Sequence, residues 1–228
     1  MAFNGFQPET YVFLEELKAN NTRDWFAANK SRYESHVLDP ALDFIDAMAE
    51  PLTKISTQFV ASSRRSGGSL MRVYRDTRFG NNKTPYKTNI GIQFRHRLAK
   101  DVHAPGFYVH VATDGVFLGV GSWRPDSAAL ARIREAVAEN SDAWVKTRDQ
   151  RKFRGAFKLV GECLKTAPRG FAKDHPMLED LRRKDFLGVH DMPANAPLNP
   201  QFVAAASQRF ADAEPFMRFL CMALQLEF

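Results

Sequence analysis

The residues best suited to chemistry are the basic side chains between Arg64 and Arg97. This segment of 34 residues carries nine lysines and arginines against one acid, Asp76, which gives a net charge of +8. The whole chain is only +6, so the remainder, with 23 basic and 25 acidic residues, is −2. The positive charge therefore belongs to one segment. Its basic residues are Arg64, Arg65, Arg72, Arg75, Arg78, Lys83, Lys87, Arg95 and Arg97.

The spacing of these residues favours a site for an anion. Guanidinium groups match phosphate and carboxylate oxygens, and an acid among them can orient one arginine by a charge-assisted hydrogen bond. A turn at Gly80-Asn81-Asn82 would bring backbone N–H groups to the anion, and Pro85 would stiffen the approach of a tyrosine and a lysine. We therefore predict that the segment binds a small molecule bearing phosphate or carboxylate. The candidate residues are Arg72, Arg75, Asp76, Arg78, Lys83, Tyr86 and Lys87.

Three other interpretations of the same charges stay open. A run of charge is commonly a solvated face, or pairs with acids elsewhere on the chain. A nucleic-acid interface is an alternative, since the isoelectric point is about 9.4 and Tyr74, Phe79 and Tyr86 offer rings for stacking. No helix-turn-helix, zinc-finger or RNA-recognition signature supports it. The third interpretation is an interaction protein whose basic face docks an acidic partner.

Other chemistries have little support. The six histidines show no H-x-x-x-H spacing and the two cysteines no C-x-x-C, so we expect no metal site and no cofactor. His103 and His110 are candidate proton carriers. Neither G-x-S-x-G nor G-x-x-x-x-G-K occurs, and Gly119-Val120-Gly121 lacks the third glycine of a dinucleotide-binding motif. No nucleophile is evident, and whether the protein is an enzyme stays undecided.

Two neighbouring motifs carry a family resemblance. The runs Val73–Phe79 (VYRDTRF) and Lys83–Asn89 (KTPYKTN) resemble an uncharacterised family of bacterial and fungal proteins, a domain of unknown function. Pieces such as Gly106-Phe107-Tyr108 and Pro168-Arg169-Gly170-Phe171 are similar too, so the resemblance covers most of the chain. It implies a single domain over residues 1–228, and it implies no activity, cofactor or catalytic residue.

The elements that must position these residues form an α+β fold. Residues 70–76 alternate as a strand would, and so do residues 90–95. Residues 107–111 and 116–120 flank Thr113-Asp114-Gly115, which is typical of a β-hairpin. We expect a central antiparallel sheet over about residues 70–121, with N-terminal and C-terminal helices packed on it.

Helices are predicted before and after this sheet. In the N-terminal part Pro8 starts one helix, Thr22 caps a second, and Asp39 caps a third that Pro51 should end or kink near residue 49 or 50. After the sheet, Asp126, Ser141, Pro176, Asn199 and Pro215 mark helix starts. Residues 186–189 suggest a further strand. The signals between residues 151 and 170 conflict, and that part is left unassigned.

Length and composition fit a globular protein. The 228 residues suffice for one core, and 44% of them are apolar. No apolar run is long enough to cross a membrane, and the first residues lack the pattern of a secretory signal. Two cysteines suit reduced thiols rather than disulfides, which predicts a cytoplasmic protein without membrane partners. The sequence does not indicate an oligomeric state.

Overall fold

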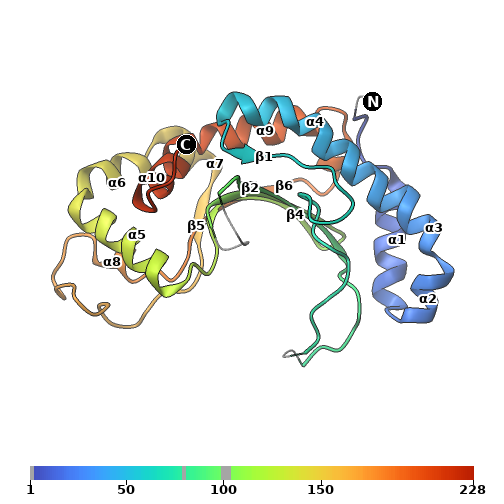
Figure 1. Cartoon of the computed structure of the whole chain (residues 1–228), viewed down its shortest axis with the longest axis horizontal. Coiled ribbons are helices and arrows are strands. Elements are labelled where there is room, and N and C mark those ends of the chain that lie inside the picture. Colours follow the sequence, from blue (N-terminus) through green and yellow to red (C-terminus); the bar gives the residue numbers. More distant parts are fainter. Residues whose placement is uncertain (1–2, 79–80, 99–103) are drawn as a thin grey trace.

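An antiparallel sheet of six strands lies at the centre of the computed structural model, which describes residues 3–78, 81–98 and 104–228. The strand order is β1-β2-β3-β4-β6-β5. Figure 1 shows the sheet curved like an arch, with helices above it and at both ends. The strands are β1 Phe59–Val60, β2 Asn89–His96, β3 Gly106–Ala112, β4 Gly115–Ser122, β5 Lys158–Val160 and β6 Phe186–Met192.

The predicted α+β class and the central antiparallel sheet are confirmed. The hairpin is β3–β4, in which Ala112 pairs with Gly115. The sheet also extends beyond the predicted 70–121, because β1 precedes this range, and β6 and β5 add to the far edge beside β4. The strand expected at residues 186–189 is β6. Within the unassigned 151–170, the chain forms a short helix and β5.

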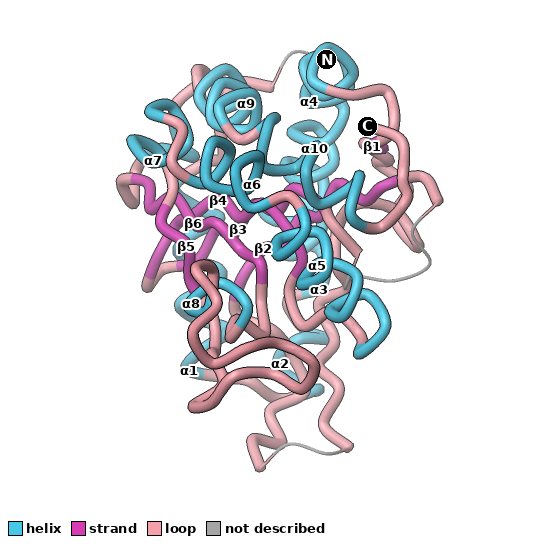
Figure 2. Tube along the Cα trace, turned by 90° about the vertical axis from the view of Figure 1, so that its left-hand side faces the viewer, coloured by secondary structure: helices cyan, strands magenta, loops and turns pink. Residues whose placement is uncertain are grey.

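Helices cover the convex face of the sheet and flank both of its ends (Figure 1). Helices α4 and α9 lie across the top of the arch, while α10 packs with α5 and α6 at one end (Figure 1; Figure 2 shows the same layers from the side). The buried apolar side chains of sheet and helices form one continuous cluster. The helices are α1 Pro8–Ala19, α2 Arg23–Ala28, α3 Lys30–Tyr33, the π-helical η1 Glu34–Leu38, α4 Asp39–Ile55, α5 Ser127–Glu139, α6 Ser141–Arg148, α7 Arg151–Ala156, α8 Leu178–Leu181, the 3₁₀-helical η2 Ala196–Leu198, α9 Phe202–Asp212 and α10 Glu214–Ala223.

Two helix caps follow the predicted chemistry. The Thr22 hydroxyl accepts a hydrogen bond from the Trp25 N–H, and the Asp126 carboxylate accepts one from the Ala129 N–H at 2.8 Å. Asp39 was expected to be a third cap, and this is wrong. The π-helical turn η1 leads directly into α4, so residue 39 is already helical.

Pro51 was expected to end or kink the third helix near residue 49 or 50, and an end at that point is wrong. Helix α4 continues to Ile55, and Met48 and Leu52 are fully buried on either side of the proline. A proline inside a helix costs about 3 kcal/mol. Burial of the apolar stripe that continues past Pro51 offsets this cost. The local sequence around the proline does not show how deeply that stripe is buried.

The strand predicted at residues 70–76 is wrong. Its start runs beside β2, since the Met71 N–H donates to the Gly91 carbonyl, but the chain then leaves the sheet. Residues 71–88 form what we call the arm, which descends below the sheet (Figure 1). Among its described residues a single isolated bridge occurs, between Tyr74 and Tyr86. Phe79 and Gly80 lie outside the described residues. Gly80 is the first residue of the predicted turn, so part of that turn is not described.

No helix in the described ranges is both long and apolar enough to pass through a lipid bilayer.

Candidate functional site

The base of the arm is attached to the N-terminal helices through Asn21. Its side-chain amide donates to the Tyr86 carbonyl and its Oδ1 accepts from the Tyr86 N–H, both at 3.0 Å. The Tyr86 side chain is only 5% exposed, and its ring stacks on Phe26 with centroids 4.0 Å apart. Tyr86 was predicted to present a ring to a ligand. In the structure its ring packs in the core and positions the arm.

The charges near the tip of the arm bind groups of the arm itself. The Arg78 guanidinium donates to both carboxylate oxygens of Asp76, at 3.0 and 2.7 Å. These bonds hold the pKa of Asp76 well below its usual range. The Lys83 ammonium donates to the Thr77 carbonyl at 2.8 Å. Asp76, Arg78 and Lys83 are exposed, and they stabilise the local shape of the tip.

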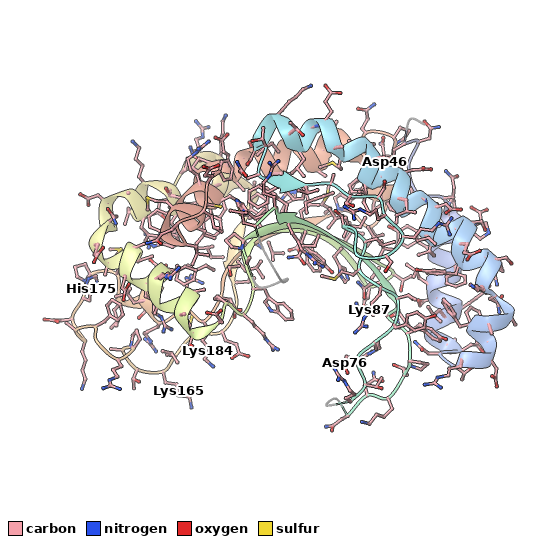
Figure 3. All side chains as sticks on the ribbon, in the orientation of Figure 1. Asp46, Asp76, Lys87, Lys165, His175 and Lys184 are labelled. Atoms are coloured by element: carbon pink, nitrogen blue, oxygen red, sulfur yellow. The ribbon has the colours of Figure 1, made fainter. Side chains whose placement is uncertain are left out.

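Three of the predicted cations gather higher on the arm. Arg72 and Arg75 lie close enough to Lys87 that their charges, together with burial as the larger effect, lower the pKa of its ammonium group. Lys87 is half-buried and points toward the inside of the arch (Figure 3). Within the described part of the chain, its ammonium forms no ion pair with a carboxylate.

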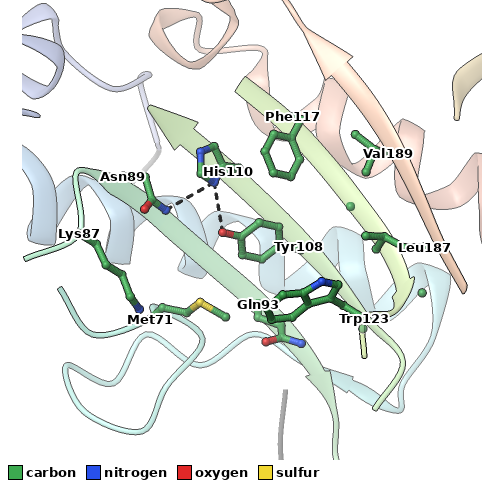
Figure 4. A pocket seen from close by; sticks show the side chains of 13 residues that line it. Met71, Lys87, Asn89, Gln93, Tyr108, His110, Phe117, Trp123, Leu187 and Val189 are labelled. Atoms are coloured by element: carbon green, nitrogen blue, oxygen red, sulfur yellow. Dashed lines mark hydrogen bonds between the residues drawn. The ribbon is translucent and has the colours of Figure 1, made fainter. Parts of the chain in front are cut away.

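Lys87 borders a cavity of about 450 Å³ under the concave face of the sheet. This volume is typical of a small-molecule site. Among the described residues that line the cavity, none is acidic. The aromatic and apolar surface comes mainly from Met71, Tyr108, Phe117, Trp123, Leu187 and Val189, and the polar groups from Lys87, Asn89, Gln93 and His110 (Figure 4).

The alternation of each strand divides its side chains between core and cavity. In β3, Phe107, Val109 and Val111 are fully buried against the helices, while Tyr108 and His110 are half-buried on the opposite face. Glycines leave room beside these rings. A side chain at Gly91 would place its Cβ 2.8 Å from the Tyr108 hydroxyl. The cavity therefore depends on these glycines as much as on the side chains that line it.

Tyr108, His110 and Asn89 form a hydrogen-bonded cluster on the cavity floor. His110 Nδ1 lies 3.3 Å from the Tyr108 hydroxyl and 3.4 Å from the Asn89 amide nitrogen (Figure 4). The amide nitrogen is only a donor, so Nδ1 is the acceptor and the ring proton belongs on Nε2. The imidazole also stacks on Phe117, with centroids 4.4 Å apart. The ring is thus fixed in orientation by contacts on its edge and its face.

Burial sets the protonation of this cluster. It raises the pKa of Tyr108 to about 12, so the hydroxyl stays protonated near neutral pH. It also lowers the pKa of His110, an effect that the charge of Asp114 opposes more weakly. His110 is therefore neutral near pH 7. In this state it can donate a hydrogen bond from Nε2, or exchange a proton there with a bound molecule.

Trp123 borders the other end of the cavity and is 48% exposed. The Arg124 guanidinium lies over its ring, 4.9 Å from the centroid. The backbone here is held by the buried Asp185, whose carboxylate accepts from the N–H groups of Arg124 at 2.7 Å and Glu162 at 3.1 Å. Asp185 thereby attaches both the end of β4 and the loop after β5 to the start of β6.

The predicted site is only partly brought together. Of the predicted residues, Lys87 alone lines the cavity under the sheet, and Arg72 and Arg75 act on it through their charges. Arg75 and Tyr86 border a separate cavity of about 410 Å³, and Asp76, Arg78 and Lys83 lie near the tip of the arm. The aromatic half of the cavity was missed, except that His110 had been considered as a proton carrier; His103 lies outside the described residues. A signal was present in β3, where Tyr108 and His110 alternate with Phe107, Val109 and Val111.

Comparisons with known proteins give a family and no activity. The family model described as a conserved hypothetical protein (DUF2461) matches residues 9–219, which confirms the resemblance to a family of unknown function. No curated protein and no solved structure matches the chain. Over the described residues, no three histidine, cysteine or acidic side chains gather as metal ligands would.

Proposed function

The chain belongs to the DUF2461 family of conserved hypothetical proteins, and because this description carries no activity, we propose a function from the cavity itself. The protein binds a small molecule that combines a flat apolar body with one anionic group, carboxylate or phosphate. The body lies against the rings of the concave face, and the anion pairs with Lys87.

The observation that carries this proposal is the environment of Lys87. Its ammonium is half-buried beside a cavity without acidic lining, and it pairs with no carboxylate of the described residues. Burial of an unpaired charge is unfavourable, so an anion that enters the cavity gains more from Lys87 than from a fully solvated lysine. Arg72 and Arg75 add to this attraction without entering the cavity lining.

The cluster on the floor supplies a second contact. The neutral His110 presents Nε2–H to a bound molecule, while Tyr108 and Asn89 fix the ring. A carbonyl or phosphate oxygen is the natural acceptor for this N–H group. The same nitrogen is the group through which a reaction of the ligand, if there is one, would exchange a proton.

We place this binding in the cytoplasm. The chain has two cysteines, the exposed Cys163 and the buried Cys221, and both are free thiols. Reducing compartments keep thiols in this state.

A matched pair of ligands tests the proposal. 2-Naphthoate and 2-naphthamide share one ring system and differ in charge, so calorimetric titration of both isolates the anion contact. We expect the acid to bind more tightly than the amide. Lys87→Met should weaken the acid by roughly tenfold or more, the value of a charge-assisted hydrogen bond, and leave the amide unchanged. Lys54→Met is the control, because Lys54 is exposed on α4 and pairs with Glu50.

Two outcomes would contradict the proposal. Equal affinity for acid and amide would show that Lys87 does not select an anion. Absence of binding of both compounds would show that the cavity does not accept a flat apolar body.

A further inference from the structure

A second cavity lies between the arm and helix α2. Its volume is about 410 Å³, which is within the range of small-molecule sites. The arm contributes Tyr74, Arg75 and Thr77 to its lining, and α2 contributes Arg23 and Ala27. Among the described residues, none lines both this cavity and the one under the sheet. The two cavities are therefore separate sites on one molecule.

Backbone contacts hold both sides of the second cavity in place. On the arm, the Arg75 N–H donates to the Pro85 carbonyl at 2.9 Å. On the helical side, Asn21 binds both backbone groups of Tyr86, and Arg23 follows two residues later as the first residue of α2. Burial raises the pKa of Tyr86, and the charge of Arg23 opposes this shift, as a cation close to the phenol does. Arg23 and Arg75 are thus held on facing sides of one space.

Two guanidinium groups border this cavity, and no carboxylate of the described residues pairs with them. Neither Arg23 nor Arg75 forms an ion pair in these parts of the chain, and no described residue of the lining is acidic. Asp76, next to Arg75 in the sequence, is bonded to Arg78 instead. The Arg75 guanidinium donates a long hydrogen bond of 3.4 Å to the Thr84 hydroxyl, which leaves most of its N–H donors to a ligand.

An exposed aromatic ring lies beside these cations. Tyr74 is 56% exposed, and its ring packs on the buried Tyr86 with centroids 5.4 Å apart. The Tyr74 ring is therefore supported from the core and still presents more than half of its surface. The Lys83 ammonium adds positive charge at the rim, since it donates to the carbonyl of Thr77 in the lining. An anion with an attached organic group would contact both the charges and the ring.

From these cations and this ring we infer that the second cavity binds a phosphate monoester, with its phosphate at Arg23 and Arg75 and its organic group against Tyr74. Planar guanidinium forks match phosphate oxygens, and a phosphate ester carries a charge of about −1.5 to −2 at pH 7, more than a carboxylate offers to two arginines. A free phosphate ester and a phosphorylated tyrosine side chain share this chemistry. The inference goes beyond the proposed function and does not depend on it, because Lys87 does not line this cavity.

Calorimetric titrations of the Lys87→Met variant isolate the second cavity, because the substitution removes the anion contact under the sheet. Phenyl phosphate should bind at least about fivefold more tightly than phenyl sulfate, which has the same ring and one negative charge. Addition of Arg23→Gln should weaken phenyl phosphate at least about fivefold, and Arg23→Lys should restore only part of the affinity. Arg23 is exposed, so these variants should fold. The control is Arg132→Gln, which removes an exposed arginine of α5 and should change nothing.

The ring contact and the source of the phosphate are tested in the same way. Tyr74→Ala should weaken phenyl phosphate about threefold and leave inorganic phosphate unchanged, whereas Tyr74→Phe should weaken neither. A short peptide with a central phosphotyrosine identifies the source. Tighter binding of the peptide than of phenyl phosphate supports a phosphorylated side chain as the ligand, and equal affinity supports a free ester.

Three results would overturn the inference. They are absence of phenyl phosphate binding in Lys87→Met, equal affinity for phenyl phosphate and phenyl sulfate, and an affinity for phenyl phosphate that Arg23→Gln leaves unchanged. None of them affects the proposed function, which the dependence of 2-naphthoate on Lys87 tests separately.

Discussion

Replacement of Gly121 by alanine should strongly destabilise the protein. Gly121 lines the cavity at the end of β4 with φ +117°, a conformation that residues with a side chain rarely adopt. Its Cβ would lie 2.0 Å from the Phe186 carbonyl oxygen, which belongs to the backbone of β6. Neither atom can move unless β4 and β6 separate at this point.

The magnitude follows from these two effects. The unfavourable φ costs about 1–3 kcal/mol. The forced shift of packed backbone adds a similar amount, about 1–3 kcal/mol. We therefore expect Gly121→Ala to lower the free energy of unfolding by roughly 2–6 kcal/mol, a large share of the 5–15 kcal/mol typical of a domain. For a chain of this size the melting temperature should fall by about 10 °C.

Gly119→Ala is the matched control, because Gly119 lies two residues earlier on the same face of β4. Its nearest contact for an added Cβ is the Tyr108 Cβ at 3.4 Å, an ordinary van der Waals distance. This variant should stay within about 1 kcal/mol of the parent. Urea denaturation followed by circular dichroism measures both. A Gly121→Ala variant as stable as Gly119→Ala would show that the clash with the Phe186 carbonyl is absent.

Further predictions concern the supports of the site. Tyr86→Ala should lower the free energy of unfolding by about 3–5 kcal/mol because the ring stacks on Phe26 in the core, whereas Tyr86→Phe should lower it little. Equal effects of the two substitutions would show that the ring is not packed in the core. Asp185→Ala leaves two backbone N–H groups without their acceptor and should cost about 2–3 kcal/mol, and an unchanged denaturation midpoint would contradict this. Burial lowers the pKa of His110 below 6.5, so the unfolded chain binds its proton first as the pH falls. Stability should therefore decrease below pH 6.5 more steeply in the parent than in His110→Asn, and parallel curves would exclude the effect.

The sequence predicts the parts of the fold whose signal is local. Strands β2, β3 and β4 alternate between core and cavity, and Thr22 and Asp126 cap helices by contacts within one turn. The errors arise where distant packing decides. Pro51 lies inside a helix because Leu52 is buried beyond it. Asp39 is not a cap because the preceding turn is already helical, and its carboxylate pairs with Arg65 at 2.8 Å.

The candidate site shows the same division. The charge of the arm is a sequence property, and it led to Lys87, Arg72 and Arg75. The cavity, however, exists because β2, β3, β4 and β6 lie side by side, and their cavity residues come from positions 89 to 189. No spacing motif connects Trp123 with Tyr108. Likewise, Tyr86 lies in the same basic segment as Lys87, and only the stacking on Phe26 shows that its ring belongs to the core.

One face of the sheet packs against the helices and stabilises the fold, whereas the other face lines the cavity. Substitutions on the two faces can therefore be selected separately. The inward side chains of β3 and β4 are buried, and a polar replacement there would disrupt the core. Replacements at Tyr108, His110 or Phe117 would change the shape and polarity of the cavity with only modest loss of stability, because these side chains are half-exposed. Homologous proteins can thus diverge in what they recognise while they retain one scaffold, and the same positions are the rational choice for a library that alters specificity.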